Sequence, residues 1–327
     1  MNGPRIVIGL SAVIVAVTED APYVVVTRDA DGLQSGLPFG PFDPAGDRTL
    51  ELSLRGWVSE QTGFDIGYVE QLYTFGDRGR EVALADIASR PDRVISISYL
   101  AFTPSRAVLN REGARWRSWY EFFPWEDWRS GRPGVIDEHI APALSIWAEG
   151  AQSRALASQR LARARLAFAL GDAVWNEERA LDRYELLYEA ELVPEAAHDR
   201  SRLEGPAWPE TQIAQAVGEP MLSDHRRILA TAIGRLRAKI KYRPVVFELA
   251  PERFTLLSLQ RIVEAIAGLD LHKQNFRRLL DRTGLVEGTG AFDTSAGGRP
   301  AELFRCRREA LAERPVGGVH VPAPRRD

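Results

Sequence analysis

Residues 254–307 follow the apolar and polar pattern expected for two short helices and a strand hairpin. Thr255 stands where a helix N-cap is expected. The apolar residues after it recur at three- and four-residue spacing, which places them on one buried helix face: Leu256, Leu259, Ile262, Val263 and Ile266. Gly268 is expected to end this first helix.

A second helix is predicted to begin near Leu271, and its two sides differ in chemistry. The side expected to pack inward carries Leu271, Phe276, Leu279 and Leu280. The other side carries His272, Lys273, Gln274, Asn275, Arg277, Arg278 and Arg282. After Gly284, two strand-like segments flank a flexible run at 288–298, which is typical of a hairpin with a loose tip. Two helices and a hairpin in this order predict a winged helix-turn-helix.

The polar side of the second helix has the chemistry that DNA recognition needs. A helix in the major groove uses long donors for phosphate oxygens and amide groups for base edges. Lys273, Gln274 and Asn275 supply both at its N-terminal end, and Arg299 at the hairpin tip is placed for a flanking phosphate or minor groove. The predicted DNA-binding residues are Thr255, Lys273, Gln274, Asn275, Arg277, Arg278, Arg282 and Arg299.

Basic charge is concentrated in this third of the chain. Residues 224–308 contain 17 Lys or Arg and nine Asp or Glu, whereas the whole chain has a net charge of -3. Cations on a helix most often form a solvated face, and composition alone leaves that interpretation open. The order of the elements, together with Gln274 and Asn275, favours nucleic-acid binding.

The N-terminal third has the pattern of an α/β domain. Strands are predicted at 5–17 and 22–27, joined by a polar turn, and a Gly/Pro-rich loop at 32–46 follows them. A helix with apolar Leu50, Leu52, Leu54, Trp57 and Val58 is expected to end at Gly63, where a left-handed C-cap costs least. Further strands are predicted at 66–74 and 94–102.

Composition narrows the class of protein. A chain of 327 residues with 45% hydrophobic content can hold two or more domains with real cores. The longest apolar run, 6–17, is too short to span a bilayer and is rich in β-branched residues, so we interpret it as a buried strand. The chain has one cysteine, Cys306, and five scattered histidines, so we expect neither a disulfide framework nor a zinc site. The low cysteine content fits a reducing compartment, and we therefore expect a cytoplasmic location.

The segment 37–64, LPFGPFDPAGDRTLELSLRGWVSEQTGF, resembles the Nudix loop-helix-loop. In that family the helix glutamates hold divalent metals on a nucleoside diphosphate, so that water can attack a phosphorus. The end of the motif is matched by Glu60, Thr62, Gly63 and Phe64. Four positions depart from it: Arg48, Gly56, Trp57 and Gln61. One remaining motif carboxylate does not make a metal cluster, so the resemblance implies the fold and argues against hydrolysis.

The chain as a whole resembles the Nudix-related transcriptional regulators of NAD metabolism, the NrtR family and its alphaproteobacterial NadQ-like type. The resemblance rests on EQLYTFGDRGR at 70–80 with RVISISYLAF at 93–102, on residues 224–266, and on NFRRLL with GGRPAELFR near the C-terminal end. It implies an α/β/α Nudix-like sandwich with a helical insertion, followed by a C-terminal winged helix-turn-helix. It also implies a homodimer on double-stranded DNA and a nucleotide effector in the Nudix cleft.

These observations divide the chain into four parts. Residues 1–104 and 184–243 are expected to form the Nudix-like domain, 105–183 a mainly helical insertion, 244–312 the winged helix, and 313–327 a disordered tail. Within the insertion we predict one long helix at 152–184, with an apolar stripe of Leu156, Leu161, Leu166, Phe168 and Leu170. That stripe fits a dimer contact, a lid or plain core packing. Residues 185–192 are expected to return to the sheet, and 224–241 to form its last helix.

The candidate effector residues lie where the family pocket would be. A pyrophosphate needs cations and donors, and an adenine ring needs an aromatic or aliphatic surface. The candidates are Arg28, Phe39, Tyr73, Phe75, Arg78 and Arg80. Each also has a plain structural interpretation, with the aromatic residues in the core and the arginines facing solvent. The effector implied is an adenine nucleotide or NAD-related metabolite (ATP, ADP-ribose or NAD), with or without Mg²⁺, and no cofactor is obligatory.

The favoured hypothesis is a repressor of NAD biosynthesis genes whose DNA affinity is set by this effector. A second class is a Nudix ADP-ribose pyrophosphohydrolase with a fused regulatory domain, which would rebuild a metal site from Glu51 and Glu60. A third is an RNA-binding or protein-interaction adaptor.

Overall fold

The computed structural model describes residues 6–18, 20–28, 34–77, 93–204, 213, 216–242, 244–294 and 300–307. Its centre is a mixed sheet with the order β3-β2-β1-β6-β5, to which β4 is added beside β1 and β7 beside β2. The strands are β1 (Ile6–Thr18), β2 (Ala21–Arg28), β3 (Ser35–Gly36), β4 (Phe39–Pro41), β5 (Val69–Phe75), β6 (Arg93–Phe102) and β7 (Arg115–Ser118). Strands β1 and β6 are parallel, and the other pairs are antiparallel.

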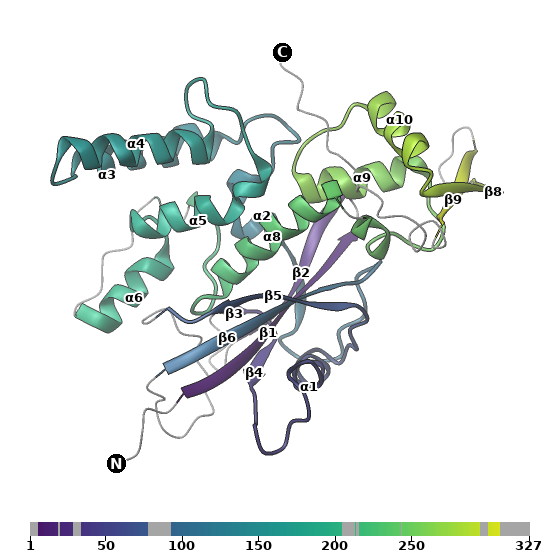
Figure 1. The fold of residues 1–327 in the computed structure, drawn as a ribbon, viewed down its shortest axis with the longest axis horizontal. Coiled ribbons are helices and arrows are strands. Elements are labelled where there is room, and N and C mark those ends of the chain that lie inside the picture. Colours follow the sequence, from purple (N-terminus) through teal and green to yellow (C-terminus); the bar gives the residue numbers. More distant parts are fainter. Residues whose placement is uncertain are drawn as a thin grey trace.

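Helix α1 (Leu50–Thr62) covers one face of this sheet (Figure 1). Its buried residues Leu54 and Val58 pack in a cluster with Leu10 and Ile14 of β1. The hydroxyl of Thr49 caps the first turn by accepting from the amide of Leu52. The helix ends at Gly63 with φ 67°, as predicted, and a Cβ there would lie 2.9 Å from that of Asn110. Both the backbone conformation and the contact therefore require glycine.

The other face is covered by helices from the middle and the end of the chain (Figure 1). The helices that contact its strands are α2 (Trp119–Phe122), α8 (His225–Tyr242) and α9 (Leu256–Ala267). The remaining helices pack on these or on one another: α3 (Ala141–Glu149), α4 (Arg154–Phe168), α5 (Ala180–Glu189), α6 (Pro194–Glu204) and α10 (Lys273–Thr283). A π-helix at Ile136–Ile140 precedes α3, and 3-10 turns lie at Pro124–Glu126, Glu177–Arg179 and Val245–Glu248. The last described elements along the chain are β8 (Val286–Asp293) and β9 (Ala301–Cys306), which form a hairpin.

One hydrophobic core joins the sheet to the C-terminal helices. Val13 of β1, Ile233 of α8, Val263 of α9 and Phe276 of α10 belong to the same buried cluster. Aromatic residues of the middle segment fill it further, since Trp119, Phe122, Phe123 and Trp125 are at most 1% exposed. The C-terminal helices are thus packed directly on the α/β domain.

Four expectations for the middle segment need correction. The long helix at 152–184 is two helices, because Ala169 adopts a left-handed conformation (φ 51°) that ends α4. Leu161 and Leu166 are 46% and 50% exposed, so the predicted apolar stripe is not a single buried face. Residues 185–192 do not return to the sheet, because they form the end of α5 and the turn after it. In addition, β7 places part of the expected helical insertion in the sheet.

A buried ion network holds these layers together. The Glu126 carboxylate accepts from Arg183 Nε at 2.5 Å and from Arg183 Nη2 at 2.7 Å, and it also pairs with Arg237. All three side chains are fully buried. Burial disfavours the carboxylate, but the two guanidinium groups outweigh it and hold the pKa of Glu126 below its ordinary value. The remaining donors of Arg237 reach backbone carbonyls, including that of Ile266 at the end of α9 (2.8 Å).

No helix in the described ranges is long and apolar enough to cross a membrane.

Replacing Glu126 by Gln should destabilise the protein by about 3–5 kcal/mol, because two buried guanidinium groups lose their only carboxylate partner. Urea unfolding of the full chain measures this change. The control is Asp172→Asn, which removes an exposed carboxylate paired with Arg165 and should leave the urea midpoint in place. Equal midpoints for Glu126→Gln and the wild type would show that the network contributes nothing to stability.

Candidate nucleic-acid interface and ligand cleft

Helix α10 carries the predicted recognition residues on its open side. Phe276 and Leu280 are fully buried and Leu271 just before the helix is 8% exposed, which confirms the predicted inward face. The polar candidates are all exposed: Lys273, Gln274, Asn275, Arg277, Arg278 and Arg282. None of these six makes a hydrogen bond or ion pair with the described parts of the chain, so their donors are available to a partner. The arrangement suits phosphate and base contacts.

The two remaining DNA-binding candidates are placed differently. Thr255 caps α9, since its hydroxyl accepts from the amide of Ser258 at 3.0 Å while the Ser258 hydroxyl accepts from the Thr255 amide. Its contact with DNA stays a prediction. Arg299 lies outside the described residues.

The hairpin is attached to the helices as a wing. Strands β8 and β9 pair antiparallel, and Phe254, just before α9, exchanges two backbone hydrogen bonds with Phe304 of β9 (2.8 and 3.0 Å). Gly268 (φ 68°) ends α9, as predicted, and Gly284 (φ 61°) ends α10, both in the left-handed conformation that favours glycine. The order helix, helix, wing is as expected, with β8 longer than predicted because it includes Gly288 to Asp293.

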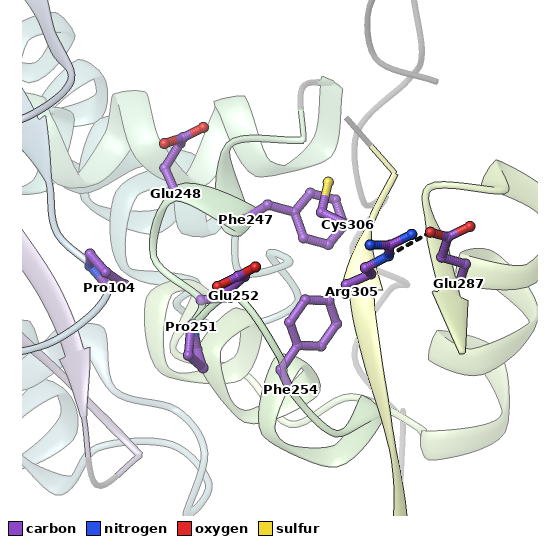
Figure 2. A pocket seen from close by; sticks show the side chains of 10 residues that line it. Pro104, Phe247, Glu248, Pro251, Glu252, Phe254, Glu287, Arg305 and Cys306 are labelled. Carbon is purple, nitrogen blue, oxygen red and sulfur yellow. Dashed lines mark hydrogen bonds and ion pairs between the residues drawn. The ribbon is translucent and has the colours of Figure 1, made fainter. Parts of the chain in front are cut away.

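A groove of about 810 Å³ lies between the wing and the segment that links α8 to α9 (Figure 2). Its floor includes the stacked rings of Phe247 and Phe254, whose centroids are 5.9 Å apart. Glu248, Glu252 and Glu287 also line it, and Glu287 accepts from Arg305 at 2.6 Å. Three carboxylates against one guanidinium disfavour a pyrophosphate, so this groove does not have the character of a nucleotide site.

The segment from Ser35 to Pro41, which we call the strap, runs between α1 and α8. On the α1 side, Gln61 makes two hydrogen bonds with the backbone of Phe39: its amide nitrogen donates to the carbonyl (2.6 Å), and its oxygen accepts from the N–H (3.1 Å). Trp57 donates from its indole to the carbonyl of Pro41 at 2.9 Å. A Cβ at Gly40 would lie 2.2 Å from the Trp57 ring, so the strap and α1 are in close contact.

On the α8 side, the strap rests against His225. The amide of Leu37 donates to Nδ1 of His225 at 2.9 Å, and the ring of Phe39 meets the imidazole edge to face at 4.9 Å. His225 is fully buried, and burial lowers its pKa to about 3, so the ring is neutral at physiological pH. Sequence reasoning missed this residue, because a lone histidine without ligand spacing carries no signal.

The candidate effector residues are partly brought together. Phe39 is half-buried on the strap, and Arg28 is exposed at the end of β2, paired in register with Ser35. Phe75 is 4% exposed and its ring lies under the guanidinium of Arg227 on α8, which agrees with the interpretation of Phe75 as a core residue. Tyr73, in contrast, is 56% exposed. Arg78 and Arg80 lie outside the described residues.

The carboxylates near α1 are not gathered. Glu51 pairs with Arg55 on the surface, and Glu60 is exposed. Within the described ranges, no group of three or more His, Cys, Asp or Glu side chains is placed to hold a metal ion.

Comparison with known proteins identifies the C-terminal part. Residues 246–306 match the family model of the NrtR DNA-binding winged helix domain. The ADPR responsive transcriptional repressor NtrR of Acinetobacter baylyi is 40% identical over 93 residues, which are 28% of this chain and 37% of that protein. The matched region thus covers well under half of the length of that repressor.

Solved structures match almost the whole chain. Shewanella oneidensis NrtR complexed with a 27mer DNA has a TM-score of 0.56 at 17% identity, over 96% of this chain and 99% of that one. A second crystal structure of NrtR from the same organism has a TM-score of 0.53 at 18% identity, over 93% of this chain and 96% of that one. A MutT/nudix family protein from Enterococcus faecalis gives 0.51 at 15% identity over 94% and 88%.

These matches confirm the predicted fold class. Residues 246–306 are similar to the NrtR DNA-binding winged helix domain, and the chain has the fold of Shewanella oneidensis NrtR, an α/β domain followed by a winged helix.

Proposed function

We propose that this protein is a DNA-binding transcriptional repressor whose operator affinity is set by ADP-ribose bound in the Nudix-like domain. The observation that carries the proposal is α10, an exposed helix with unpaired Lys273, Gln274, Asn275, Arg277 and Arg278 inside a winged helix domain of the NrtR DNA-binding type. The ADPR responsive repressor of Acinetobacter baylyi supports the choice of effector. ATP and NAD are further candidates for the same cleft.

The remaining parts of the proposal follow the resemblance to regulators of NAD metabolism. The target genes are those of NAD biosynthesis, and the protein acts in the cytoplasm as a homodimer. A dimer presents two α10 helices to half-sites about one DNA turn apart, so a change in their relative placement alters operator affinity. The domain division at 104, 183 and 243 belongs to the same proposal, except that β7 (Arg115–Ser118) is part of the Nudix-like sheet.

We further propose that the Nudix-like domain binds its ligand without hydrolysing it. The supporting observation is that residues at motif positions make structural contacts: Gln61 and Trp57 donate hydrogen bonds to the backbone of the strap. Nearby, Glu51 is paired with Arg55. Mg²⁺ is then not needed for a chemical step.

Arg277→Ala and Arg278→Ala should each weaken binding to every duplex and lower the slope of log affinity against log salt by about 1, because each removes one phosphate contact. Asn275→Ala should instead relax preference at one base pair, by about 1–3 kcal/mol. Fluorescence anisotropy with a duplex selected from a random pool by the full-length protein measures both effects.

The control for these variants is Arg165→Ala, which removes one positive charge from α4, outside the winged helix. It should bind like the wild type. If all three α10 variants also bind like the wild type, α10 is not the recognition helix.

Adding ADP-ribose should change operator affinity by roughly 5-fold to 150-fold, the range expected for a coupling of about 1–3 kcal/mol. A mobility-shift titration with and without ADP-ribose, ATP or NAD measures the change and identifies its direction. Ligand control is wrong if none of these compounds alters binding while calorimetry confirms that the protein is folded.

Incubation with ADP-ribose and magnesium should yield no AMP above the rate without protein, because the described carboxylates do not converge on a metal site. Chromatography of the nucleotides checks this expectation. Robust turnover would favour the pyrophosphohydrolase instead, and Glu60→Gln would then test whether the motif glutamate participates.

A further inference from the structure

The contact between the strap and His225 leaves one buried donor without an acceptor. Because the Leu37 amide donates to Nδ1, that nitrogen carries a lone pair, and the proton of the neutral ring must be on Nε2. Nε2 is buried and has no hydrogen-bond partner among the described residues. An unmatched buried N–H is unfavourable, and such groups in native structures ordinarily find an acceptor.

The surroundings of this donor have the character of a nucleotide site. The Phe39 ring lies against the imidazole, and a Cβ at Gly36 would come within 3.0 Å of Nδ1, so the strap is seated directly on the ring. Arg115 of β7 donates to the hydroxyl of Ser35 at 3.3 Å, and its Nε is a second buried donor for which the described residues provide no acceptor. Arg28 is paired in register with Ser35. The Phe39 ring and the Arg115 guanidinium therefore adjoin the same short strap, and an arginine stands opposite Ser35 in the sheet.

We infer that His225 is an effector-binding residue whose Nε2–H donates to an acceptor oxygen of bound ADP-ribose. This inference rests on the proposed function and adds to it one residue outside the Nudix motif. Since His225 is the first residue of α8, the bound ligand would contact the helix that reaches the winged helix through Arg237 and Ile266.

Two substitutions separate the two ring nitrogens. Asn places an amide near the position of Nδ1, so His225→Asn keeps an acceptor for the Leu37 amide and loses the Nε2 donor. Gln places its amide near the position of Nε2, so His225→Gln keeps a donor to the ligand and loses the contact with the strap. Isothermal titration of the full chain with ADP-ribose measures binding, and thermal unfolding without ligand measures stability.

We expect His225→Asn to unfold near the wild-type temperature and to bind ADP-ribose at least 10-fold more weakly. We expect His225→Gln to unfold at a lower temperature and to bind ADP-ribose within about 3-fold of the wild type. The difference in affinity between the two variants is of the size expected for one buried hydrogen bond. A purely structural histidine gives the opposite order, with affinity following stability.

If the wild type and His225→Asn bind ADP-ribose equally well, this inference is wrong but the proposed function stands. Wild-type protein that does not bind ADP-ribose would overturn the proposed function and this inference with it. As an independent readout, the slowly exchanging Nε2–H proton signal that His225→Asn lacks should shift when ADP-ribose is added to the wild type. An unchanged signal in the ligand-bound protein would count against the contact.

Discussion

The structure depends on the buried carboxylate of Glu126 and the two arginines that share it. Arg183 comes from α5 and Arg237 from α8, and Arg237 also donates to the carbonyl of Ile266 at the end of α9. Two guanidinium groups against one carboxylate leave an excess positive charge inside the protein. Backbone carbonyls of Ala167, Asn176 and Glu177 and the face of Trp175, 3.8 Å from the Arg183 guanidinium, offset it. Burial of such a group is tolerable only with nearly every donor satisfied, which fixes the relative positions of these helices.

Under the proposed function, this constraint would decide how ligand binding alters the DNA-binding helices. The winged helix shares one hydrophobic core with the sheet and is tied to it by the ion network, so it is not a domain hanging on a flexible linker. Tyr120 strengthens the attachment by donating to the carbonyl of Ala265 at 2.7 Å. Helix α8 spans about 27 Å at 1.5 Å per residue, and it carries His225 at one end and Arg237 three turns later. A small shift at the strap would therefore move α8 together with the helices that are packed on it.

How much of this could be predicted depends on the distance over which residues act. The winged helix was predictable because its signals are local: the cap at Thr255, the spacing of Leu259 and Val263, and the glycines at 268 and 284. The ion network was not, since Glu126 lies 57 residues from Arg183 and 111 from Arg237, and charged residues are expected at the surface. The error over 152–184 has a similar cause, because Ala169 in a left-handed turn has no composition that marks it.

The contact between Gln61 and the strap shows how a position of the Nudix-like motif can serve a different purpose. The Gln61 amide donates to the carbonyl of Phe39 and accepts from its N–H, so both backbone polar groups of that residue pair with one side chain. A glutamate at this position, as the resemblance would lead one to expect, could accept from the N–H but would face the carbonyl oxygen with negative charge. Glutamine is therefore suited to hold the strap, and glutamate to hold a metal. The strap is thereby fixed between Gln61 and His225, and under the proposed function this fixed surface would support the bound ligand.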